Sequence, residues 1–195
     1  MPCFPEHDYN MGQYYICVVI NDERRVVWAY STFGGAKLME HSYFGQRRVL
    51  AAMERLRHRP QRMVWVGDYA DGEPDGTHLY SAGHEWESEN HGDVNTKHWR
   101  ESDSQDKSLK SEESLRFLVN HDRHEIIDLQ VYLRDDVHPL PLLTAEGNGR
   151  GGGDFLGNGN VGIWSRQLIS SETLLDAQVY IDLGYTKVEQ FFTEG

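Results

Sequence analysis

Carboxylate and arginine side chains stand among many glycines between residues 140 and 160, where the sequence reads LPLLTAEGNGRGGGDFLGNGN. Glycine is usually placed where the backbone needs a positive φ or a close approach to another group. Successive backbone N–H groups in such a turn form an anion-binding nest, and an arginine adds a bidentate contact. We therefore predict a ligand-binding segment formed by Glu146, Asn148, Arg150, Gly151, Gly152 and Asp154.

The charges of this segment restrict the ligand. Glu146 and Asp154 flank Arg150, and these carboxylates would repel a purely anionic molecule. A ligand that carries both phosphate and hydroxyl groups, such as a nucleotide-like molecule, fits better. The alternative is structural: Arg150 pairs with Asp68, Asp71 or Glu146, and the glycines only permit a tight loop.

Known glycine motifs do not account for this segment. Gly147, Gly149 and Gly152 match the dinucleotide-binding spacing, but that motif needs a helix directly after the glycines, and GGDFLGNGNVG does not favour one. No P-loop lysine follows, and the other kinase elements are missing. A single imperfect copy of a calcium-binding nonapeptide cannot build a β-helix.

General acid–base chemistry has its own candidates, namely His41, Asp68 and Asp71, with Glu146 and Asp154 as further carboxylates. Asp68 and Asp71 come at the end of a predicted buried strand, where loops often carry functional residues. The alternative is that DYADGEPDG is simply a turn, since Asp, Gly and Pro are turn formers. No GxSxG or HExxH motif is present, so the sequence identifies no reaction.

A polar, acidic stretch contains three histidines at seven-residue intervals, His84, His91 and His98. This spacing matches no compact set of metal ligands. We therefore expect no metal site there, and we expect residues 81–114 to form a polar excursion with little regular structure. The sequence identifies no cofactor.

The elements that must position these residues are mostly strands. Runs of β-branched and aromatic residues around turn formers predict hairpins over 14–30 and 115–129. Apolar residues spaced by three and four predict an amphipathic helix over 44–60, ended by Pro60. Further strands are predicted over 63–69, 161–169 and 178–183, and over 185–192 we expect a last strand or a short helix.

The two hairpins have similar patterns, which suggests a duplication, and a tryptophan-containing strand is expected after each, holding Trp65 and Trp164. The fold class is therefore α+β: a strand-rich single domain over residues 11–195 with one clear amphipathic helix and a pseudo-duplicated, hairpin-based sheet. Residues 1–10, with two prolines, are predicted to form an extended arm.

Composition narrows the function classes. The 195 residues have a formal net charge of −12, which disfavours binding to duplex nucleic acid, because that needs a basic surface. Two cysteines cannot build a disulfide framework, and no apolar run is long enough for a membrane span. We expect a reduced, cytoplasmic protein with no membrane partner.

Four blocks are together distinctive: MGQYY, KLMEHSYFG, VWVGDYAD and HPLPLLTAEGNGRGGGDF, the last followed by VGIW. In these blocks the chain resembles an uncharacterised family of hypothetical proteins of bacteria and their phages. The resemblance implies a cytoplasmic accessory protein of a bacterium or virus, and it assigns no activity, cofactor or residue role. For a viral protein, countering host defence would be a natural role. The leading hypothesis is a protein that binds a nucleotide-like ligand or a partner protein. The alternative is a hydrolase or transferase acting on a nucleotide-type substrate.

Overall fold

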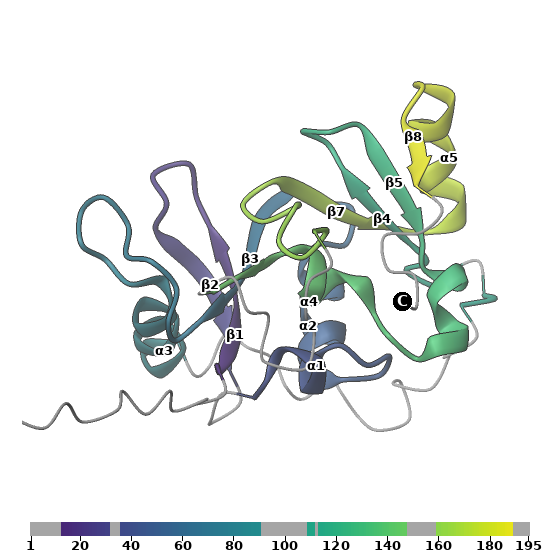
Figure 1. Cartoon of the computed structure of the whole chain (residues 1–195). Helices are drawn as coiled ribbons and strands as arrows, with labels where there is room; N and C mark the ends of the chain where they lie inside the picture. The colour runs from purple at the N-terminus through teal and green to yellow at the C-terminus, as the bar shows by residue number, and fades with distance from the viewer. Residues whose placement is uncertain (1–12, 32–35, 91–108, 112, 148–158, 189–195) are drawn as a thin grey trace, which may run out of the picture.

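Two antiparallel hairpins supply four strands of an eight-stranded sheet (Figure 1). The first pairs β1 (Tyr15–Ile20) with β2 (Val26–Tyr30), and the second pairs β4 (Phe117–Asn120) with β5 (Glu125–Asp128). Both hairpins are confirmed. The computed structural model describes residues 13–31, 36–90, 109–111, 113–147 and 159–188, so the predicted arm at 1–10 and residues 91–108 of the predicted excursion lie outside the described residues.

The strand order β2-β1-β3-β7-β4-β5-β8 is symmetric about its third and fourth strands, except for the added edge strand β8 (Thr186–Val188). Strands β3 (Gln61–Gly67) and β7 (Leu168–Glu172) run antiparallel at the centre. Each is flanked by the first strand of its own hairpin. This order is the arrangement that a duplicated hairpin unit predicts.

The central contact of the sheet is short. Strands β3 and β7 pair only through Gln61 with Ile169 and Arg62 with Leu168. Further along, β3 pairs instead with the two-residue strand β6 (Ala145–Glu146), in parallel. Strand β3 therefore pairs with β7 at its beginning and with β6 further along, and β6 places the beginning of the glycine segment beside β3.

Helices connect and cover the strands: α1 (Leu38–His41), α2 (Arg47–Arg55), α3 (Leu79–Glu89), the 3₁₀ helix η3 (Leu129–Asp135), α4 (Pro139–Leu143) and α5 (Leu174–Asp182). Helix α2 confirms the predicted amphipathic helix, and it buries Val49, Ala52 and Met53. The α+β fold class is therefore shown. No helix among the described residues is long and apolar enough to cross a membrane.

The core lies on both faces of the sheet. In β1, Cys17 and Val19 face a large cluster that includes Trp65, whereas Ile16 and Val18 face a second cluster under α3. This alternation is the two-residue period of a strand. Strand β4 contributes to a third, smaller cluster under α5. The pairing register places α3 and α5 on the same side of the sheet.

Helix α3 differs from the prediction, since residues 81–89 of the expected excursion are helical. Its packing rests on few residues. A Cβ at Gly83 would lie 2.5 Å from Ile16 Cδ1, so this glycine allows the helix to lie close to the sheet. Glu87 accepts a hydrogen bond of 2.9 Å from the backbone N–H of Ser31. Residues 81–89 are therefore polar in sequence but belong to a helix that packs on the sheet.

Two predicted strands are wrong in part. Residues 178–183 were expected to be extended because Val179, Ile181 and Leu183 alternate, but residues 178–182 belong to α5. The hydroxyl of Thr173 caps this helix by accepting from the backbone N–H of Asp176, and local capping outweighs the alternation. Residues 161–166 form turns, so Trp164 precedes β7 rather than lying in a strand. The expected final element is the strand β8.

Candidate metal centre

His41, the predicted acid–base residue, lies in the core. It is fully buried in α1, and its Nδ1 accepts a hydrogen bond of 2.5 Å from Trp65 Nε1. Burial, with Arg48 as a smaller cause, lowers the pKa of His41 to about 3. The ring is therefore neutral at pH 7 and shielded from solvent, and this placement does not favour contact with a substrate.

Asp68 and Asp71 follow β3, as the sequence predicts. Asp68 Oδ1 accepts a hydrogen bond of 3.1 Å from the backbone N–H of Tyr14, and Asp71 is exposed in the turn that follows. Within the described part of the chain, no hydrogen bond joins either residue to Glu146 or to His41. The predicted constellation is therefore not brought together by these contacts.

Glu146 is held by an arginine that sequence reasoning missed. Arg166 forms a bidentate pair with it, with Nε 2.6 Å from Oε1 and Nη2 2.7 Å from Oε2. Ser165 Oγ donates to the same carboxylate at 2.6 Å, and Arg166 Nη2 also contacts Glu73 Oε1 at 2.5 Å. This hydrogen bond from Arg166 lowers the pKa of Glu73. The remaining predicted ligand residues, Asn148, Arg150, Gly151, Gly152 and Asp154, lie outside the described residues, so the ligand segment stays a prediction.

The first glycine of the segment has a packing role. A Cβ at Gly147 would lie 2.4 Å from Gln13 Oε1 and 2.6 Å from the Tyr15 hydroxyl oxygen. Tyr15 donates to the same Gln13 oxygen at 2.8 Å. Gln13 Nε2 is buried and has no hydrogen-bond partner among the described residues. An unused amide donor therefore lies beside the point where the glycine segment begins.

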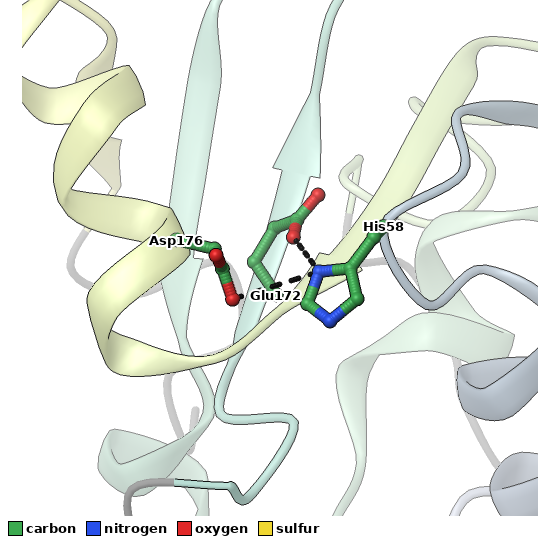
Figure 2. Close-up of side chains that lie close together, drawn as sticks. All are labelled: His58, Glu172 and Asp176. Atoms are coloured by element: carbon green, nitrogen blue, oxygen red, sulfur yellow. Dashed lines mark hydrogen bonds and ion pairs between the residues drawn. The ribbon is translucent and has the colours of Figure 1, made fainter.

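The structure assembles a different centre, His58, Glu172 and Asp176, from three separate elements (Figure 2). His58 lies between α2 and β3 with a φ of 49°, and its backbone N–H donates to Ser171 O at 3.2 Å. Glu172 is the last residue of β7, and Asp176 lies in the first turn of α5. Sheet pairing and the cap of α5 thus fix all three positions.

The donor atoms of the centre lie close together. His58 Nδ1 is 2.7 Å from Glu172 Oε2 and 3.6 Å from Asp176 Oδ2, and the three donor atoms all lie within 4.8 Å of one another. The Glu172 side chain is only 2% exposed, whereas those of His58 and Asp176 are each 46% exposed. Figure 2 shows the Nδ1 edge of the imidazole facing both carboxylates, while the other ring nitrogen points away. One side of the centre is therefore open to solvent.

Hydrogen bonds outside the centre hold the two carboxylates. Ser170 Oγ donates to Glu172 Oε1 at 2.6 Å, and His121 Nε2 lies 2.8 Å from Ser170 Oγ. The hydroxyl of Thr173 bonds to Asp176 Oδ2. Burial lowers the pKa of His121, so its neutral form is favoured. With the Ser170 hydroxyl donating to Glu172, His121 Nε2–H is the donor to Ser170. Outer hydrogen bonds of this kind are typical of metal sites, where they orient the ligands.

This centre has no local sequence signal. His58 and Glu172 are separated by 114 positions in the chain, and neither belongs to a motif with metal-ligand spacing. The spacing of Thr173 and Asp176 indicates a helix start, but nothing in it points to His58. The segment before β3 pairs directly with β7, through a parallel bridge between Arg57 and Ser171, and this long-range contact brings His58 to Glu172.

No protein-family model, no curated protein and no solved structure matches this chain. The resemblance seen in the sequence blocks therefore stays a prediction, and the interpretation of the centre rests on its geometry.

Proposed function

We propose that this protein binds a divalent transition-metal ion, with Zn²⁺ as the best fit, through His58, Glu172 and Asp176. Zinc accepts imidazole and carboxylate ligands at about 2.0–2.2 Å, so the ligand atoms of a tetrahedral site lie roughly 3.3 Å apart. The separations of 2.7 and 3.6 Å from His58 Nδ1 lie on either side of this value. This closeness of three donor atoms from three elements is the observation that carries the proposal.

The charge balance of the centre also supports a bound cation. Glu172 is almost completely buried, and a buried carboxylate is costly unless a positive charge compensates it. In the described ranges, Glu172 forms no ion pair with lysine or arginine, and His58 is its basic partner. Asp176 adds a second negative charge beside them. A divalent cation would neutralise both carboxylates.

The chemistry that such an ion would supply is hydrolytic. Structural zinc sites usually have four protein ligands, whereas catalytic sites have three and keep a position for water. A bound water has its pKa lowered to about 7 and becomes a nucleophile at neutral pH. The half-exposed side chains of His58 and Asp176 leave room for water and substrate. We therefore propose a metal-dependent hydrolase as the enzymatic role.

Metal binding is tested by calorimetric titration of the EDTA-treated protein with Zn²⁺, and by the visible absorption of a Co²⁺ complex. We expect one ion per chain. Glu172→Gln should weaken binding at least about 100-fold, because it removes a charged ligand. Asp182→Asn, the same change of charge at the other end of α5, is the matched control and should bind as the unaltered chain does. No saturable binding, or equal binding by Glu172→Gln, would refute the proposal.

The hydrolytic role needs a separate assay. The zinc-loaded protein should hydrolyse the generic phosphodiester bis-p-nitrophenyl phosphate, and His58→Ala should lose this activity while Asp182→Asn keeps it. Tight zinc binding without turnover of this and related activated esters would refute the hydrolase role and leave the metal centre in place.

The glycine segment supports a second candidate function, binding of a nucleotide-like ligand or of a partner protein. The specific observation in its favour is the buried amide nitrogen of Gln13 beside Gly147, which has no hydrogen-bond partner within the described part of the chain. Native mass spectrometry before and after incubation with a metabolite extract would test it. A small-molecule adduct that Arg150→Ala removes would support this function, and an adduct equally present in both proteins would argue against it.

A further inference from the structure

A cavity of about 570 Å³ lies between the β1–β2 turn, the loop at 73–77 and helix α3. Helix α3 packs against β2 and β1 at one edge of the sheet, whereas α5, which carries Asp176 of the His58 centre, packs against β4 and β7 (Figure 1). Its volume falls in the range of small-molecule sites, which is about 300–1,000 Å³. A macromolecular partner is therefore not needed to fill it.

One wall of the cavity is a single face of α3. Ala82, Glu85, Trp86 and Glu89 line it, and their spacing of three, four and seven residues places them on one side of the helix. This wall offers two carboxylates one turn apart, and Trp86 lines the cavity on the same helix face. An aromatic face beside carboxylates suits a positively charged ligand, because the ring attracts cations.

The opposite wall carries both signs of charge. Glu23, Glu73 and Asp75 line it together with Arg24 and Arg25. Over the whole lining, five carboxylates face two guanidinium groups, so the cavity is net negative. An anionic ligand would be repelled, and a cation would be attracted.

Glu73 supplies an independent observation. Its side chain is only 4% exposed, and although Oε1 is bonded by Arg166, Oε2 has no hydrogen-bond partner among the described residues. Oε2 forms an ion pair with Arg24 Nη1 at 3.5 Å, and the Arg24 side chain is 57% exposed. A buried carboxylate oxygen without a hydrogen bond costs free energy. An N–H donor on a ligand that displaces Arg24 would satisfy it.

We propose that this cavity binds a small organic polycation of the polyamine class. Its ammonium groups would contact Glu85 and Glu89, one methylene segment would lie against Trp86, and a terminal N–H would reach Glu73 in place of Arg24. This site is independent of the metal centre, and its charge excludes the nucleotide-like ligand expected at the glycine segment.

The test is calorimetric titration of the full chain with spermidine in the presence of EDTA, which keeps the His58 centre free of metal. We expect one site per chain. The double variant Glu85→Gln/Glu89→Gln should weaken binding at least about tenfold, since two ion pairs are lost. Glu113→Gln, at an exposed position outside the cavity, should leave the affinity within about twofold.

Arginine variants give a second, opposite readout. Arg24→Ala should strengthen spermidine binding several-fold because it removes a competing cation, whereas Arg134→Ala, whose side chain is 85% exposed and lies outside the cavity lining, should not. Absence of saturable spermidine binding would overturn the proposal. Equal weakening by the double variant and by Glu113→Gln would also overturn it, as would saturable ATP binding that Arg24→Ala abolishes.

Discussion

Lowering the pH from 7 to 5 should destabilise this protein through two buried histidines. His41 and His138 are 0% and 2% exposed, and burial lowers the pKa of each to about 3. Both rings accept a hydrogen bond at Nδ1, from Trp65 Nε1 and from the backbone N–H of Leu140. Protonation would replace that acceptor with a donor, so both rings must be neutral in the folded state.

The direction and size of this destabilisation follow from the linkage between proton binding and folding. An unfolded histidine has a pKa of about 6.5, so a folded pKa near 3 means that the unfolded chain binds more protons. The stabilisation is complete above pH 6.5 and is lost as the pH falls toward 3. Each histidine contributes a slope of about 1.4 kcal/mol per pH unit, and two remove about 4 kcal/mol between pH 7 and pH 5. This loss is a large part of the free energy of unfolding of a typical single domain, which is about 5–15 kcal/mol.

Urea unfolding followed by tryptophan fluorescence, at pH 7, 6, 5.5 and 5 with EDTA present, measures this loss. The variant His41→Gln keeps a hydrogen-bond acceptor but does not titrate. The slope of the unfolding free energy against pH that is attributed to His41 and His138 should therefore fall by about half. A free energy of unfolding that is constant from pH 7 to pH 5 would refute the reasoning. The same holds if His41→Gln has the pH dependence of the unaltered chain.

Three further predictions concern packing and the two polar centres. Gly147→Ala should lower the free energy of unfolding by about 1–3 kcal/mol, because the added Cβ clashes with Gln13 and Tyr15. Gly159→Ala, with nothing within 4 Å of the added Cβ, should be tolerated. Equal urea midpoints for the two variants would contradict this prediction. Ser170→Ala should weaken zinc binding about tenfold without abolishing it, because it removes the hydrogen bond that orients Glu172, and an unchanged calorimetric affinity would argue against that role. Glu73→Gln should cost about 1–3 kcal/mol in urea unfolding at pH 7, since it weakens a buried charged hydrogen bond, and an unchanged midpoint would show that the pair adds no net stability.

The sequence predicts those elements whose signal is local. Strands β1 and β2 are runs of β-branched and aromatic residues around a polar turn, and α2 has a clear apolar face, so their positions follow from the printed sequence. Helix α3 was missed because its packing depends on Leu79, Gly83 and Trp86 among charged residues. Helix α5 was missed because its apolar residues alternate like those of a strand, although most of them are exposed.

The candidate centres show the same limit. Glu146 could be singled out as a carboxylate beside glycines, but its partner Arg166 lies 20 positions further on, in a turn that was expected to be a strand. His58 and Glu172 meet because the segment before β3 forms a bridge to β7, 114 positions further along the chain. Pairing between distant strands is not encoded in any short window of sequence, so a single chain gives no signal for this contact.

The short contact between β3 and β7 gives the chain the character of a covalent dimer. Each half has its own hairpin and its own covering helix, and two residue pairs join the central strands. The His58 centre lies across that boundary, since His58 precedes β3 while Glu172 and Asp176 belong to the second half. An ion held there would act as a cross-link between the halves. Its binding would add RT ln(1 + [ion]/Kd) to the free energy of unfolding. In symmetric oligomers a site shared by two subunits makes assembly and ligand binding mutually dependent, and here a single chain contains both partners.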